Sequence, residues 1–92
     1  MEVILILSSV EMSCIVEKYG NDLLRISYLY LKDIQLAEDA VQDTFIKVFH
    51  SYHKLENLNK EKAWILSITI NICKNYFRTS WYKRIRFFDD LR

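Results

Sequence analysis

Turn-forming residues are nearly absent from this 92-residue sequence, and their scarcity limits the possible folds more than any other feature. β-Sheets need tight turns, which depend on glycine, proline and asparagine–glycine pairs. The chain has no proline and one glycine, Gly20, and it contains no asparagine–glycine pair. Apolar residues make up 51% of the sequence, which is enough for one small core. We therefore expect a single all-α domain, a small bundle of about four helices.

Two stretches show the spacing of three and four residues that is typical of amphipathic helices. The first has one continuous apolar face, formed by Ala37, Ala40, Val41, Thr44, Phe45, Val48, Phe49 and Tyr52. The second runs from Lys60 to Arg86, and its apolar arc contains Ile65, Ile68, Thr69, Ile72, Cys73, Tyr76 and Phe77. These two stretches are expected to supply most of the core.

Capping residues mark where the helices are expected to begin. Ser8 and Glu11 have the spacing of a capping box at the start of the first helix. Gly20 either ends that helix or kinks a longer one. Asp33 is a suitable cap for the next helix, and Asn57 or Asn59 for the long one.

The helical domain is expected to span residues 10–86. Residues 1–9 form an apolar leader, and the sequence leaves its structure undecided. Its apolar run, Val3 to Leu7, is too short to span a bilayer. Glu2 stands where a signal peptide has basic residues. Residues 87–92 are expected to begin a linker or to fray.

Several kinds of chemistry are not indicated by the sequence. Cys14 and Cys73 fall at apolar helix positions, so we expect buried thiols in a reducing, cytoplasmic protein without membrane insertion. His50 and His53 lie three residues apart without a third metal ligand nearby. No glycine-rich phosphate loop and no catalytic constellation is present. We therefore expect no enzyme activity, metal or cofactor.

Charge divides the chain into two parts. Residues 1–59 hold five Lys and Arg against nine Asp and Glu, a net charge of −4. Residues 60–92 hold eight against three, a net charge of +5. Such an asymmetry indicates one basic and one acidic partner, and chance segregation in a short chain is the alternative.

The acidic part concentrates polar side chains on the helix expected over residues 37–52. Opposite its apolar face lie Asp39, Gln42, Asp43, Ile46 and His50, flanked by Glu38 and Lys47. Ile46 sits among these polar residues. A single exposed isoleucine is ordinary on a protein surface. An apolar residue ringed by acids is equally consistent with the centre of an interface for a basic partner.

The basic part shows an unusual polar face on the long helix. Away from the apolar arc lie amides, cations and aromatic rings: Trp64, Ser67, Asn71, Lys74, Asn75, Arg78 and Tyr82. No carboxylate occurs between Lys62 and Asp89. This mixture suits a nucleic-acid strand, because cations meet phosphates, amides meet base edges and rings stack on bases. A core helix with an ordinary basic surface is the alternative.

Read together, the segments AEDAVQDTFIKVFHSY (37–52) and AWILSITINICKNYFR (63–78) resemble region 2 of bacterial RNA polymerase sigma factors of the extracytoplasmic-function (ECF) group. The segment YGNDLLRISYLYLKD (19–33) resembles the opening of the same region. The resemblance extends from about residue 10 to residue 86. It implies a helical domain that acts in transcription initiation without covalent chemistry. Full members of the group also carry a second, helix-turn-helix domain, so we expect this domain alone to bind polymerase weakly.

The resemblance also implies two binding surfaces and their residues. Docking on the β′ clamp helices of core RNA polymerase is assigned to Asp39, Gln42, Asp43, Ile46 and Lys47. Binding of the non-template single strand of the promoter minus-ten element is assigned to Lys54, Leu55, Glu56, Asn57, Trp64, Asn71, Lys74, Asn75, Arg78, Tyr82, Lys83 and Arg84. An anti-sigma factor is a further implied partner. The alternatives are a helix-turn-helix-type DNA-binding module without polymerase contact and a helical protein-interaction adaptor.

Overall fold

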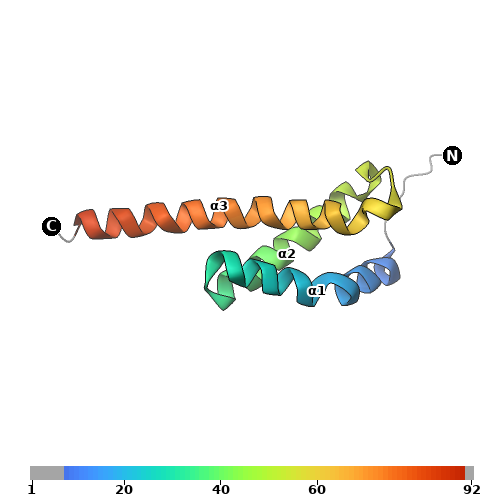
Figure 1. Ribbon diagram of the computed structural model, residues 1–92, viewed down its shortest axis with the longest axis horizontal. Coiled ribbons are helices and arrows are strands. Elements are labelled where there is room, and N and C mark those ends of the chain that lie inside the picture. Colours follow the sequence, from blue (N-terminus) through green and yellow to red (C-terminus); the bar gives the residue numbers. More distant parts are fainter. Residues whose placement is uncertain (1–7, 91–92) are drawn as a thin grey trace.

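The computed structural model describes the backbone of residues 8–90 and the side chains of residues 8–79. This part of the chain contains three α-helices, α1 (Ser9–Leu31), α2 (Ile34–Ser51) and α3 (Glu61–Asp90) (Figure 1). Two 3₁₀ turns, η1 (Tyr52–Lys54) and η2 (Leu58–Lys60), connect α2 to α3. The predicted all-α class is confirmed, with three α-helices in the described residues where about four were expected.

The difference in number comes from α1, which runs through Gly20 without a break or a positive φ angle. Glycine in a helix interior costs about 1 kcal/mol relative to alanine, and tertiary packing can override that cost. Here Tyr19 and Leu23, on either side of Gly20, are both buried. The chain reverses instead at Lys32, which adopts the left-handed conformation with φ 55°.

The predicted helix starts are mostly confirmed. Ser8 and Glu11 form the capping box of α1, with the Glu11 backbone N–H donating to the Ser8 hydroxyl. Asp33 caps α2 by accepting from two backbone N–H groups. Asn57 accepts from the backbone N–H of Asn59 at the start of η2, which leads directly into α3.

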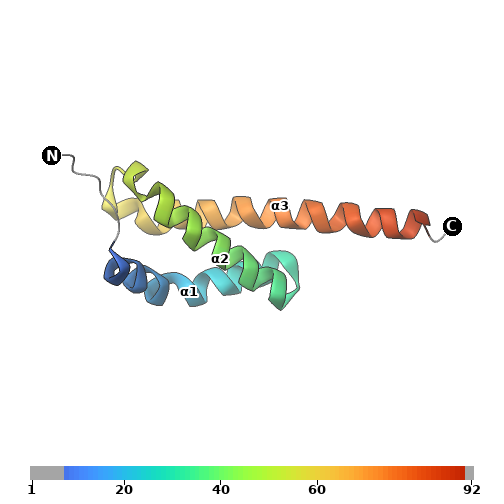
Figure 2. The same cartoon turned by 180° about the vertical axis from the view of Figure 1, so that it is seen from behind.

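The three α-helices contact one another pairwise. Figures 1 and 2 show α1 and α2 as a hairpin, with α3 lying across it and continuing past it toward the C-terminus. Residues 87–90 belong to this helix, and residues 1–7 of the expected leader lie outside the described part of the chain.

Two groups of buried residues form the core. The larger group is shared by all three helices and contains Ile15, Tyr19, Leu23, Val48 and Ile65. The smaller group contains Leu31, Ala40 and Cys73. The thiol of Cys73 is buried as predicted, and burial raises its pKa. The prediction for Cys14 is wrong: its side chain is exposed, because it points about 100° away from that of its buried neighbour Ile15.

One polar pair lies inside the packed helices. Thr44 of α2 and Thr69 of α3 are both fully buried, and their Oγ1 atoms are 3.1 Å apart. The Thr44 hydroxyl donates to the backbone carbonyl of Ala40, so it accepts from Thr69. The Thr69 hydroxyl also lies 3.2 Å from the backbone carbonyl oxygen of Ile65, so each hydroxyl has an acceptor within its own helix. The contact between the two threonines therefore joins α2 to α3 without leaving a buried hydroxyl unpaired.

Gly20 provides a test of the continuous α1. A Cβ atom built at this position meets nothing within 4 Å. We expect Gly20→Ala to raise the free energy of unfolding by about 0.5–1 kcal/mol, because alanine loses less backbone entropy in a helix. Urea denaturation followed by circular dichroism measures this change. A decrease in stability would contradict an unbroken α1 with open space at residue 20, and Gly20→Pro, which breaks helices, is the opposite control.

Candidate functional site

The outer face of α2 carries the acidic surface that the sequence predicts. Asp39, Gln42, Asp43 and Lys47 are exposed, and Ile46 is 56% exposed among them. Phe49 was expected on the apolar face, but it is 44% exposed and lies one turn beyond Ile46. The α2 surface therefore presents two apolar side chains within a polar surround. An exposed apolar residue surrounded by polar side chains is the arrangement found at the centre of many protein interfaces.

One residue of this surface has a second contact that the sequence did not reveal. The hydroxyl of Tyr76 in α3 donates a hydrogen bond to the Asp43 carboxylate. This hydrogen bond, with burial, raises the pKa of Tyr76 to about 12. Asp43 thus links α2 to α3, whereas the sequence placed Tyr76 simply within the apolar arc.

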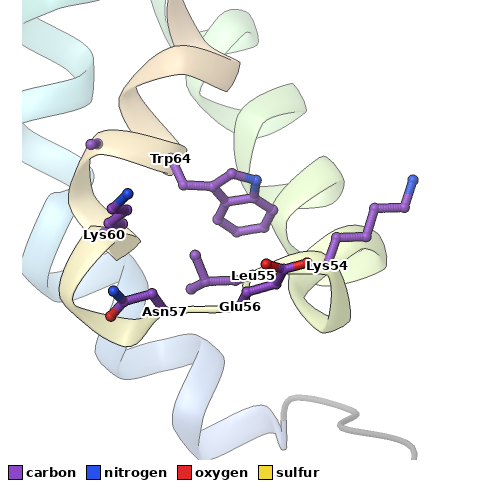
Figure 3. A pocket seen from close by; sticks show the side chains of 7 residues that line it. Lys54, Leu55, Glu56, Asn57, Lys60 and Trp64 are labelled. Atoms are coloured by element: carbon purple, nitrogen blue, oxygen red, sulfur yellow. The ribbon is translucent and has the colours of Figure 1, made fainter.

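A pocket lies between the loop that follows α2 and the first turn of α3. Its volume is about 410 Å³, and it is lined by Lys54, Leu55, Glu56, Asn57, Lys60, Ala63 and Trp64. Figure 3 shows the Trp64 indole pointing toward Leu55, with Asn57 and Lys60 at one side and Lys54 at the other. The structure therefore brings together the predicted loop residues and the predicted tryptophan, and it adds Lys60 and Ala63. We call this hollow the loop pocket.

Trp64 differs in placement from the other residues of the predicted DNA-binding face. It is half-buried, and it packs against the larger core group. Its ring meets the Tyr52 ring edge to face, with centroids 6.0 Å apart and an interplanar angle of 72°. Trp64 therefore forms a wall of the loop pocket and belongs at the same time to the packed interior.

The loop between α2 and α3 is fixed by its own backbone. The Leu55 N–H donates to the Tyr52 carbonyl at 3.0 Å, and the Lys60 N–H donates to the Asn57 carbonyl at 2.9 Å. The Asn57 side chain accepts from the Asn59 N–H at 2.9 Å. The Asn57 oxygen accepts in this bond, and its NH₂ group can act as a donor.

The Glu61 carboxylate forms hydrogen bonds that link the two ends of this loop to each other and to α1. Glu61, the first residue of α3, accepts a hydrogen bond from the Tyr19 hydroxyl at 2.7 Å and another from the Tyr52 hydroxyl at 2.5 Å. Burial, followed by these hydrogen bonds, raises the pKa of Tyr19 and of Tyr52 from 10.0 to about 12. No sequence pattern indicates this cluster, because its members lie far apart in the chain and each has an ordinary helical role.

Further along α3, the predicted amides and cations lie on the surface. Asn71, Lys74, Asn75 and Arg78 are all exposed. A second hollow, of about 340 Å³, is lined by Lys74, Phe77 and Arg78 together with Tyr30 of α1, which no sequence pattern had indicated. The backbone of residues 82–84 belongs to α3. The side chains of the predicted DNA-binding residues Tyr82, Lys83 and Arg84 fall outside the described part of the chain.

Among the described side chains, those of residues 8–79, no group of three His, Cys, Asp or Glu is arranged to hold a metal ion. Within residues 8–90, no helix is both long and apolar enough to cross a membrane.

Comparison with known proteins gives consistent matches. The chain matches the Sigma-70 region 2 family over residues 15–82. It is 36% identical over 62 residues to the ECF RNA polymerase sigma factor SigX of Bacillus subtilis (strain 168), covering 67% of this chain and 32% of SigX. It is 32% identical over 77 residues to SigM, an ECF RNA polymerase sigma factor of the same organism, covering 84% of this chain and 46% of SigM.

A third relative is the RNA polymerase sigma factor HrpL of Pseudomonas syringae pv. syringae, which is 27% identical over 48 residues, covering 52% of this chain and 26% of HrpL. The matched region is therefore less than half as long as each of these relatives. No solved structure matched the chain.

The tyrosine cluster around Glu61 predicts a pH-dependent stability. The pKa of Tyr19 and of Tyr52 is higher in the folded chain than its ordinary value of 10.0. Their hydrogen bonds therefore stabilise the fold in full below about pH 10, and this contribution is lost as the pH rises towards about 12. We expect Glu61→Gln to destabilise the chain at pH 8 and to show a smaller further loss at pH 11 than the wild type. Urea denaturation at the two pH values measures both changes, and equal losses in the two proteins would contradict the role of the cluster.

Proposed function

Because the chain belongs to the Sigma-70 region 2 family, whose members are transcription factors and not enzymes, we propose that it binds core RNA polymerase and one strand of a promoter. The loop pocket, followed along α3 by the exposed Asn71, Lys74, Asn75 and Arg78, is the observation that supports this function most directly. We place this activity in the cytoplasm, where polymerase and promoter DNA meet, and an anti-sigma factor remains a proposed regulator.

The loop pocket has the chemistry that an unpaired base requires. Trp64 and Leu55 offer apolar surface to the face of a base. Asn57 and Glu56 supply polar groups at the rim, and such side chains pair with base edges through their NH₂ donors or carboxylate oxygens. A base inside a duplex is stacked and paired, so only an extruded or single-stranded base has both its face and its edge available.

The free energy gained from the expected contacts is large enough to offset the cost of extruding a base. Extruding a base costs a few kcal/mol. Stacking on an aromatic side chain contributes roughly 1–3 kcal/mol per base. Lys74 and Arg78 lie on the exposed side of the same helix, where they can contact the phosphates of the strand. The domain therefore favours an open strand by adding pocket contacts to phosphate contacts.

The polymerase contact is proposed on the outer face of α2. Asp39, Gln42, Asp43 and Ile46 lie together there, with Lys47 at the edge. Ile46 supplies an apolar anchor, and the acids complement a basic partner surface. Since α2 and α3 present different faces, both partners can bind at the same time.

The first prediction from this function concerns DNA. We expect the 92-residue chain to bind single-stranded DNA of the non-template minus-ten element more tightly than the same sequence as a duplex. Lys74→Glu combined with Arg78→Glu should weaken that binding and lower the slope of log K against log salt by about 1.4, because each phosphate contact to a single strand contributes about 0.7. Fluorescence anisotropy over a range of salt concentrations measures both quantities.

The matched control reverses two exposed cations of α1 and its C-cap, Arg25 and Lys32. Arg25→Glu combined with Lys32→Glu changes the net charge by the same amount and should leave the salt slope unchanged. A clear preference for duplex DNA would favour the helix-turn-helix alternative. Equal effects of the two double substitutions would favour the adaptor alternative, in which the basic surface is incidental.

The second prediction concerns polymerase. Asp39→Lys should reduce capture of a β′ clamp-helix fragment by about tenfold or more, because it places a cation against a basic partner. Asp43→Lys should do the same, although it also breaks the hydrogen bond from Tyr76. A pull-down with increasing amounts of the fragment measures the change.

Glu17 of α1 provides the control for these charge reversals. It is exposed, and it lies on a different helix from the proposed interface. Glu17→Lys therefore makes the same change in charge off that interface. If Glu17→Lys reduces capture as much as Asp39→Lys does, binding depends on net charge and not on this face of α2.

A further inference from the structure

We propose that Tyr19, Tyr52 and Glu61 are positioning residues that hold the loop pocket in the shape that accepts an unpaired base. This inference rests on the proposed function for the identity of the ligand. It assigns a role to three residues that neither the sequence pattern nor the family match singles out.

The cluster connects the loop to the core at both of its ends. Tyr52 begins η1 at the start of the loop, and Glu61 begins α3 immediately after it. Each oxygen of the Glu61 carboxylate accepts one hydroxyl, Oε1 from Tyr19 and Oε2 from Tyr52. Tyr19 is only 5% exposed and belongs to the larger core group. The two ends of the loop are therefore tied to each other and to a fixed point on α1.

The same cluster reaches the wall of the pocket through Tyr52. The Tyr52 ring packs edge to face against the Trp64 ring, and Trp64 lines the pocket. Glu61 lies three residues before Trp64, so the two side chains emerge from neighbouring positions on the same turn of α3. A shift of Tyr52 would alter the position of the Trp64 ring.

Glu61 is also an unusual residue to find beside a surface proposed to bind phosphates, since its charge repels them. Two features of its position offset this cost. A carboxylate is stabilised at a helix N-terminus, and Glu61 is the first residue of α3. The two tyrosine hydroxyls occupy its oxygens. The carboxylate thus acts as an acceptor that joins two helices and a loop.

The experiment compares two probes for wild type, Glu61→Gln and Tyr52→Phe. One probe is a fluorescein-labelled single-stranded DNA of mixed sequence, and the other is a strand of equal length made entirely of abasic units. The abasic strand retains the phosphates but has no base for the pocket. We expect the wild type to bind the base-bearing strand about fivefold more tightly or better, as one stacked base would give. Both variants should lose most of that preference while binding the abasic strand as the wild type does.

A merely structural role would give a different result. If the cluster only stabilised the fold, the variants would weaken binding of both strands equally and the preference would remain, which would overturn the inference. Tyr28→Phe is the matched control, because it removes an exposed tyrosine hydroxyl from the same helix as Tyr19. It should leave the preference unchanged. If Glu61→Gln fails to fold, Tyr52→Phe decides, since it removes a single hydroxyl.

One further variant separates the two proposals. Trp64→Leu removes the aromatic wall while keeping an apolar side chain. If this variant keeps the wild-type preference for bases, the pocket is not a base site, and the proposed function fails together with the inference. If Trp64→Leu abolishes the preference but Glu61→Gln and Tyr52→Phe retain it, the pocket binds bases and only the positioning role is overturned.

Discussion

The packing of α3 against both other helices is the interaction on which the rest of the structure depends. Ile65, Thr69 and Cys73 follow one another at intervals of four residues, and all three are fully buried. Ile65 joins the larger core group, Thr69 meets Thr44 and Cys73 joins the smaller group. Partly buried neighbours of this strip, such as Ile68 and Ile72, also pack against the two core groups. The remaining side of α3 lies at the surface, where Asn71, Lys74, Asn75 and Arg78 are exposed.

The polar contacts at the edges of this strip follow a common pattern. Asp43 accepts from Tyr76, and Glu61 accepts from Tyr19 and Tyr52. In each case a carboxylate at the α3 interface is matched by tyrosine hydroxyls, which are neutral at physiological pH and bring their own apolar rings into the packing. Cations are therefore not needed as partners for these acids. Lys74 and Arg78 remain exposed at the surface, where they are available for the phosphate contacts that we propose.

Features set by local sequence could be predicted, whereas those set by contacts between distant residues could not. The caps at Ser8 and Asp33 follow from spacing along one helix, and the structure confirms them. The same spacing predicted two buried thiols, and only that of Cys73 is buried. The continuity of α1 through Gly20 depends on what packs on either side of it, so the glycine alone left both outcomes open. The exposure of Phe49 depends on how far the neighbouring helices extend over α2. The Glu61 cluster needs residues from three elements, and Tyr30 approaches α3 only in the folded chain. The candidate pocket was predicted in outline, through the loop and Trp64, but the residues that fix its shape were not.

Ordering the loop before DNA binds is favourable, because the entropy cost of ordering it is large compared with the free energy of stacking one base. Ordering a flexible residue costs about 1–2 kcal/mol in backbone entropy alone. A loop that became ordered only when DNA arrived would pay this cost for several residues, and the total would exceed the roughly 1–3 kcal/mol that one stacked base returns. For the base pocket that we propose, a loop that is ordered beforehand avoids this cost. The backbone bonds of Leu55 and Lys60, the Asn57 cap and the Glu61 carboxylate provide that order in the absence of DNA. In the proposed function, the free energy of base stacking is then left to offset the cost of extruding the base from the duplex.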